Sequence, residues 1–159
     1  MPIDPHLPVV GRGFCYEDLP VGYKFRTHRR TIAESDLTAF VNLTWLTEEL
    51  FAVEDEGPSG IASRAISGRA VPGALVYSFA EGLLLPTMQD TGLAFLGAQL
   101  DIKAPTRVGD TIHVEAEVIE ARLTSKGDRG LVRTANIVVN QHDVTVLAYN
   151  PLRMLKRRG

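Results

Sequence analysis

The stretch Arg69-Ala70-Val71-Pro72-Gly73, followed by the apolar run from Ala74 to Leu85, decides the fold of this chain. The Pro-Gly pair predicts a turn, and Leu75, Phe79 and Leu83 recur at the spacing of one helical face. We therefore expect a long apolar helix over residues 73–85, closed by Pro86. Such a helix must be covered by other elements. Its start presents free backbone N–H groups, which can hold a negatively polarised oxygen.

The segments after this helix alternate between apolar and polar residues and predict its cover. We expect four long strands in hairpin succession, over residues 93–103, 111–124, 131–139 and 144–155. Gly97 predicts a bend in the first strand, and a change of alternation near Ile119 predicts a β-bulge in the second. A polar strand over residues 23–31, two short helices and a long loop over residues 54–68 come before the apolar helix. The fold class is therefore α+β, a single antiparallel curved sheet wrapped around one long apolar helix.

The composition is that of one ordinary globular domain. The chain has 159 residues, 45% of them hydrophobic, and we expect an N-terminal arm over residues 1–15 and one domain over residues 16–159. The net charge of −2 gives no general attraction to nucleic acid or to an anionic membrane. Cys15 is the only cysteine, which excludes an internal disulfide and a multi-cysteine metal site, and no His/Asp/Glu cluster has metal-ligand spacing. With no signal-peptide pattern and no apolar stretch of about 20 residues, we expect a cytoplasmic protein without a metal.

Three motifs carry a resemblance to a known family. They are Ala104-Pro105-Thr106-Arg107-Val108-Gly109-Asp110-Thr111-Ile112, Phe40-Val41-Asn42-Leu43-Thr44 with the following Glu48-Glu49-Leu50-Phe51-Ala52, and the opening stretch before the apolar helix. Together they resemble the MaoC-like acyl dehydratases and (R)-specific enoyl-CoA hydratases of the hot-dog fold. The similarity extends from about Tyr16 to Arg157, nearly the whole chain.

The resemblance implies an acyl-thioester site. Hydratases of this type add water across the double bond of a trans-2-enoyl thioester, usually of coenzyme A, and use an Asp and a His from a loop between the first two helices. A backbone N–H at the start of the hot-dog helix holds the thioester oxygen, and Gly73 carries this role over. The family also implies a homodimer that pairs two sheets edge to edge, with acyl-CoA as substrate or ligand and no further cofactor.

The chain departs from the family pattern where the catalytic pair is expected. Trp45 stands at the position of the family histidine and Thr47 at that of the following aspartate, while Pro72 replaces a histidine just before the hot-dog helix. The four histidines, His6, His28, His113 and His142, all lie elsewhere. Indole has only a weakly acidic N–H, so it cannot act as a general acid or base.

Other residues are candidates for the missing roles, each with a structural alternative. Glu48 is either a catalytic carboxylate or a first-turn helix charge. Glu81, inside the apolar helix, is either a structural partner of a cation or an acid or base with a raised pKa. Asn42 and Thr44 could bind a thioester carbonyl or water, or simply cap and pack a helix. Four further residues are candidates for substrate binding: Trp45, which could plug the pocket, stack on an acyl or pantetheine chain or pack in the core; Arg64 and Arg69, which could contact phosphates or be solvated; and Pro72.

Three functions remain open from the sequence. The first is a hydratase or dehydratase of acyl thioesters with rearranged catalytic groups. The second is a non-catalytic acyl-CoA-binding subunit, which the missing Asp/His pair favours. The third is a hot-dog thioesterase with Glu81 as its carboxylate. Because function depends on the site more than on the fold, the side chains around Gly73 should decide among them.

Overall fold

The computed structural model describes residues 5–53 and 69–159. Its elements in chain order are the 3-10 helix η1 (Tyr16–Asp18), β1 (Lys24–Arg26), β2 (Arg30–Thr31), α1 (Glu34–Thr44), α2 (Glu49–Ala52), α3 (Gly73–Met88), β3 (Gly92–Gly97), β4 (Leu100–Ile102), β5 (Thr111–Leu123), β6 (Arg129–Val139), β7 (Thr145–Tyr149) and β8 (Leu152–Lys156). None of these helices has the length and apolar character needed to cross a bilayer.

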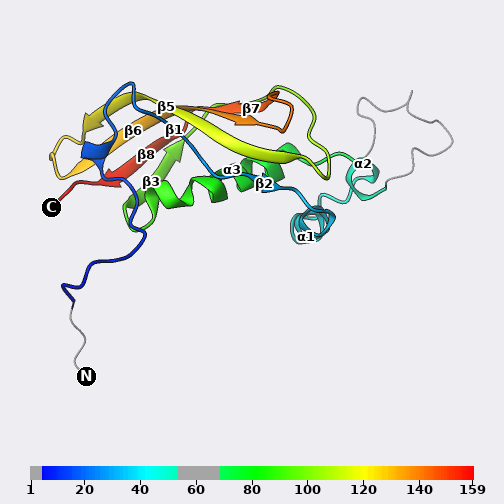
Figure 1. Ribbon diagram of the computed structural model, residues 1–159, viewed down its shortest axis with the longest axis horizontal. Coiled ribbons are helices and arrows are strands. Elements are labelled where there is room, and N and C mark those ends of the chain that lie inside the picture. Colours follow the sequence, from blue (N-terminus) through cyan, green and yellow to red (C-terminus); the bar gives the residue numbers. More distant parts are fainter. Residues whose placement is uncertain (1–4, 54–68) are drawn as a thin grey trace.

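One antiparallel sheet covers α3, which confirms the α+β hot-dog architecture (Figure 1). Its strand order is β1-β5-β6-β7-β4, with β2 also on β5 and with β8 joining β6 to β3. The long β5–β6 hairpin forms the centre of the sheet. The helices α1 and α2 lie together beyond the start of α3 (Figure 1).

The core lies between α3 and the concave face of the sheet. Its buried members include Leu75, Val76, Ala80 and Leu84 from α3, and Ile112, Val114, Val138, Val146 and Leu147 from β5, β6 and β7. Alternate residues of β5 are buried from Ile112 to Val118, as the alternation of the sequence predicts. At the other end of α3, the amides of Gly13 and Phe14 donate hydrogen bonds to Gln89 and Thr87, so the end of the arm packs on the helix.

Some element boundaries differ from those predicted. The helix does not end at Pro86 but contains it and continues to Met88. The single strand expected over residues 23–31 is two short strands, β1 and β2, and the strand expected over residues 93–103 divides into β3 and β4 after Gly97, where φ is 150°. The last strand likewise divides into β7 and β8 around Pro151, which lacks the N–H that a ladder needs. The two breaks lie beside each other, since the amide of Gln99 donates to the side chain of Asn150 (2.7 Å) and the amide of Asn150 to the carbonyl of Gln99 (3.2 Å).

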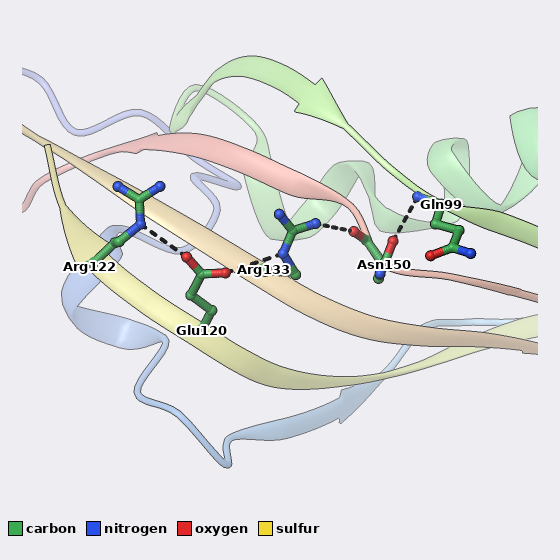
Figure 2. A network of polar contacts seen from close by, with 5 residues as sticks. All are labelled: Gln99, Glu120, Arg122, Arg133 and Asn150. Atoms are coloured by element: carbon green, nitrogen blue, oxygen red, sulfur yellow. Dashed lines mark hydrogen bonds and ion pairs between the residues drawn. The ribbon is translucent and has the colours of Figure 1, made fainter.

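A polar network links this break to the bulge in β5 (Figure 2). The pairing of β5 with β6 shifts register between Val118 and Glu120, which confirms the predicted bulge. Glu120 accepts hydrogen bonds from Arg122 (3.0 Å) and Arg133 (3.2 Å), and Arg133 also donates to the carbonyl of Asn150 (2.9 Å). These two arginines hold the pKa of Glu120 below its usual value.

Candidate active site

The start of α3 has two backbone donors without a backbone partner among the described residues. Pro72 is the N-cap residue, and its carbonyl accepts hydrogen bonds from Leu75 (3.0 Å) and Val76 (3.2 Å). The amides of Gly73 and Ala74 have no backbone acceptor among the described residues. Since the N-terminal end of a helix also carries partial positive charge, this is a suitable place for a carbonyl oxygen that gains negative charge.

An apolar cavity of 170 Å³ opens beside these donors. Its lining is Leu50 and Phe51 from α2, Val71, Pro72, Gly73 and Val76 around the start of α3, Ile102, Ala104, Pro105 and Thr106 around the end of β4, and Val146 and Leu147 from β7. Thr106 is the single polar side chain among these described lining residues, and it is 4% exposed. The cavity therefore suits an apolar chain that carries one hydrogen-bonding group close to Gly73.

Ile102 lies directly over Gly73. A Cβ atom added to Gly73 would come within 2.6 Å of the Cδ1 atom of Ile102, closer than real contacts allow. The glycine therefore permits the close approach of Ile102, which forms one wall of the cavity. At position 73, a larger residue would collide only with the end of the flexible Ile102 side chain.

The predicted phosphate ligand Arg69 is held inside the protein framework. Its Nε donates to the carbonyl of Phe51 (3.2 Å), and its guanidinium pairs with Glu34. Arg69 thus joins α1 and α2 to the segment that leads into α3. Arg64, the second phosphate candidate, lies outside the described residues.

The candidates from the α1–α2 connection do not line the cavity. Asn42 is exposed, and Thr44 donates its hydroxyl to the carbonyl of Phe40 (2.7 Å), which is a helix-end contact. Trp45 ends α1 in the left-handed region, with φ of 63°, and is 85% exposed. Core packing, one of the alternatives for Trp45, is therefore wrong for this chain. Glu48 is the exposed N-cap residue of α2, two positions before the cavity-lining Leu50.

Glu81 has the structural partner that the sequence called for. Both of its carboxylate oxygens accept a hydrogen bond from Nη2 of Arg153 on β8, each at 2.7 Å, and both side chains are mostly buried. Burial, followed by the charge of Glu81, raises the pKa of Tyr77 and of Tyr149 beside this pair. Glu81 lies eight residues after Gly73, about 12 Å further along the helix, and is not part of the cavity lining.

Only Pro72 and Gly73 of the described cavity lining were predicted as site residues from the sequence, and Thr106 and Ile102 are among those missed. Thr106 falls within the 104–112 motif, which predicted the fold but not a site residue. The site depends on contacts between distant segments. The amide of Val71 donates to the carbonyl of Thr106 (2.8 Å), and Ala70 forms a β-bridge with Arg107. This pairing brings the 104–112 motif to the start of α3, which residue spacing alone does not reveal.

Comparison with known proteins places the chain in a family. An (R)-specific enoyl-CoA hydratase from Aeromonas caviae is 32% identical over 106 residues, which are 67% of this chain and 75% of that protein. The chain belongs to the MaoC-like (R)-specific enoyl-CoA hydratase family. This confirms the resemblance found in the sequence motifs. No protein-family model matches the chain.

Solved structures share the fold of this chain. An unliganded R-hydratase from Pseudomonas aeruginosa is 25% identical, with a TM-score of 0.73 over 92% of this chain and 88% of that one. A MaoC-like dehydratase from Rhodospirillum rubrum, at 23% identity, shares the fold with a TM-score of 0.79 over 92% of this chain and 99% of that one. A MaoC domain protein from Chloroflexus aurantiacus, at 24% identity, shares the fold with a TM-score of 0.85 over 96% of this chain and 43% of that one.

Proposed function

We propose that this protein binds trans-2-enoyl thioesters and hydrates them, or dehydrates the corresponding 3-hydroxyacyl thioesters, at the start of α3. The observation that carries the proposal is the amide of Gly73, which has no backbone acceptor among the described residues and lies at the wall of an apolar cavity. Membership of the MaoC-like hydratase family supports the choice of substrate class. We propose that the reaction proceeds without a metal or further cofactor.

The thioester carbonyl would accept a hydrogen bond from Gly73, with its acyl chain in the cavity. During hydration, water gives its hydroxyl to C3 and a proton is added at C2, so negative charge develops on the carbonyl oxygen. A backbone donor aimed at that oxygen is typically worth about 10²–10³ in rate. The cavity volume of 170 Å³ is below the roughly 300–1,000 Å³ of pockets for drug-sized ligands, which favours a short acyl chain.

Glu48 is our choice for the acid–base group. It is the exposed N-cap residue of α2, the helix that contributes Leu50 and Phe51 to the cavity. Thr106, within the cavity, would orient the water or the carbonyl through its hydroxyl. Glu81 is not our choice for thioester hydrolysis, because Arg153 occupies both of its carboxylate oxygens.

A hydration assay of the purified protein tests this function. We expect turnover of short trans-2-enoyl-CoA thioesters, and Glu48→Gln should lower kcat at least about 100-fold with little change in KM. The neighbouring Glu49→Gln is the matched control and should retain activity. A protein inactive on every chain length would contradict the proposed hydration.

A second candidate function is a non-catalytic acyl-thioester-binding subunit. It is favoured by the lining of the cavity, in which none of the described residues ionises. In that case calorimetry would detect binding of acyl-CoA to a protein without hydratase activity. Purification from the native cell would then recover an active relative with it.

We also propose a cytoplasmic homodimer joined through the β3–β4 edge of the sheet. Leu93, Leu96, Leu100 and Ile102 are exposed along this edge, an unusual amount of apolar surface for a sheet edge left in water. A second copy would cover these side chains. It would also enclose the wall of the cavity that Ile102 forms.

A further inference from the structure

A groove of 740 Å³ lies far from the proposed thioester site. Three parts of the chain form its walls: the β1–β2 strap, the last turns of α3, and the start of β5 together with the β6–β7 turn. The strap is defined here as residues 24–31. The α3 wall of the groove is Leu83, Pro86 and Thr87, ten to fourteen residues after Gly73. These positions are about 15–21 Å along the helix from Gly73, so the groove is a separate site.

The groove is strongly basic although the chain has a net charge of −2. Arg26, His28 and Arg29 line it from the strap and His113 from β5, whereas Asp143 is the one acidic residue in its described lining. His113 contacts Glu115 at 2.9 Å.

The two groove arginines differ from their neighbours in the strap. Lys24 is paired with Glu117 (3.6 Å) and Arg30 with Asp36 (3.1 Å). Across the described ranges, 5–53 and 69–159, neither Arg26 nor Arg29 has an acidic partner within 4.0 Å. Their guanidinium groups are therefore available to bind an anion, and the planar fork of arginine matches phosphate geometry.

Two other features of the groove suit an organic group attached to that anion. The side-chain oxygen of Asn140 accepts hydrogen bonds from the amides of His142 (2.9 Å) and Val144 (3.1 Å), which fixes the side chain and leaves its NH₂ group as a donor. Leu83 and Pro86 form an apolar wall opposite the strap. The groove thus combines cations, a fixed amide donor and an apolar surface.

We propose that this groove binds an organic phosphate, with the phosphate on Arg26 and Arg29 and the organic part against Leu83 and Pro86. The ligand is a phosphate-bearing small molecule, for which a nucleotide and the phosphorylated end of coenzyme A are two possible sources. This proposal can be tested independently of the proposed hydratase function, because the test measures binding of compounds that cannot undergo hydration.

Calorimetry at low ionic strength tests the site with coenzyme A, dephospho-coenzyme A, 3′,5′-ADP and inorganic phosphate. Arg26→Gln combined with Arg29→Gln should weaken binding of the organic phosphates at least about tenfold, because two charge-assisted contacts are lost. The matched control, Lys126→Gln with Arg129→Gln, removes the same charge at the hairpin at the opposite end of β5 and should leave affinity unchanged. Equal weakening by both pairs would reduce the effect to general electrostatics and overturn the proposal.

A gain of affinity gives a second readout that does not depend on the strap variant folding. Asp143→Asn should tighten binding several-fold, because it removes the acidic group from the lining, and Asn also tolerates the positive φ of 59° at this position. Tighter binding of coenzyme A than of dephospho-coenzyme A would identify its 3′-phosphate as the group bound, and equal binding would point to the diphosphate that both share. Absence of saturable binding by any organic phosphate, or binding of inorganic phosphate alone, would overturn the proposal.

Discussion

At the scale of single residues, Gly73 sets the shape of the proposed thioester site. Gly73→Ala would place a methyl group against Ile102 and push that side chain into the cavity. Because alanine is the better helix former, we expect the free energy of unfolding to be unchanged or raised by up to about 1 kcal/mol. Acyl-thioester affinity should fall in calorimetry, and adding Ile102→Val should restore it. Loss of stability without loss of affinity would contradict the assigned role of this glycine.

Trp45 is the other residue whose backbone dictates a prediction. Its left-handed conformation costs a non-glycine residue about 1–2 kcal/mol, and its exposed side chain gains little from packing within this chain. Trp45→Gly should therefore raise the free energy of unfolding by about 0.5–1 kcal/mol in urea titrations, whereas Trp45→Ala, which keeps the Cβ atom, should not. If Trp45→Ala instead weakens acyl-thioester binding, the indole contacts the ligand.

Gly73 and Thr106 mark how far the sequence predicts the site. The Pro-Gly pair before an apolar run identifies a helix start, which is a local property, and the structure places Gly73 there. Thr106 and Ile102 reach the same cavity only through tertiary pairing, which has no local signal. Trp45 misled in the opposite direction, since a large apolar residue after an amphipathic helix is typical of a core position.

At the scale of elements, the Glu81–Arg153 pair fixes α3 to β8. Both side chains are mostly buried, so removal of either partner leaves the other charge uncompensated. We expect Glu81→Gln and Arg153→Met each to lower the free energy of unfolding by about 1–3 kcal/mol, and the double variant to lose less than the sum. A double-mutant cycle in urea measures this coupling. The exposed Glu17–Arg157 pair is the control and should show little or no coupling, because solvent screens it.

Elements whose apolar residues recur at one regular spacing could be predicted from the sequence. Strands that are divided because they change pairing partner could not. The alternation of β5 gave both the strand and its bulge, because alternate residues are buried from Ile112 to Val118 and the alternation changes where the register shifts. The division of the outer strands at Gly97 and Pro151 required knowledge of their partners, since β3 pairs with β8 whereas β4 pairs with β7. Pro86 misled because a proline removes only the hydrogen bond to the preceding turn, and beyond it the amides of Gly13 and Phe14 donate to the carbonyls of Gln89 and Thr87.

At the scale of the whole molecule, the apolar edge formed by β3 and β4 predicts the quaternary structure. Leu93→Glu combined with Leu96→Glu should convert the proposed dimer into a monomer, because charges would replace apolar surface in the interface. Size-exclusion chromatography with light scattering measures the mass. Ile119→Glu is the matched control, since Ile119 is about as exposed but lies on β5, and it should leave the dimer intact. A wild-type monomer at micromolar concentration would contradict the proposed dimer.

The strap over β5 has a consequence for assembly. β5 runs for 13 residues, and without the strap its edge would be open over most of that length. In the gap between β1 and β2, the amide of Thr27 donates to the carbonyl of Val114 (2.9 Å), and the amide of Val114 donates to the hydroxyl of Thr27 (3.0 Å). Five of the seven residues from Lys24 to Arg30 are basic. In the proposed dimer, the apolar β3–β4 edge binds a second copy, while the basic strap on the opposite edge disfavours one. A chain in which both sheet edges could pair with another copy would polymerise into an open filament. With unlike edges, the proposed assembly would close at two copies.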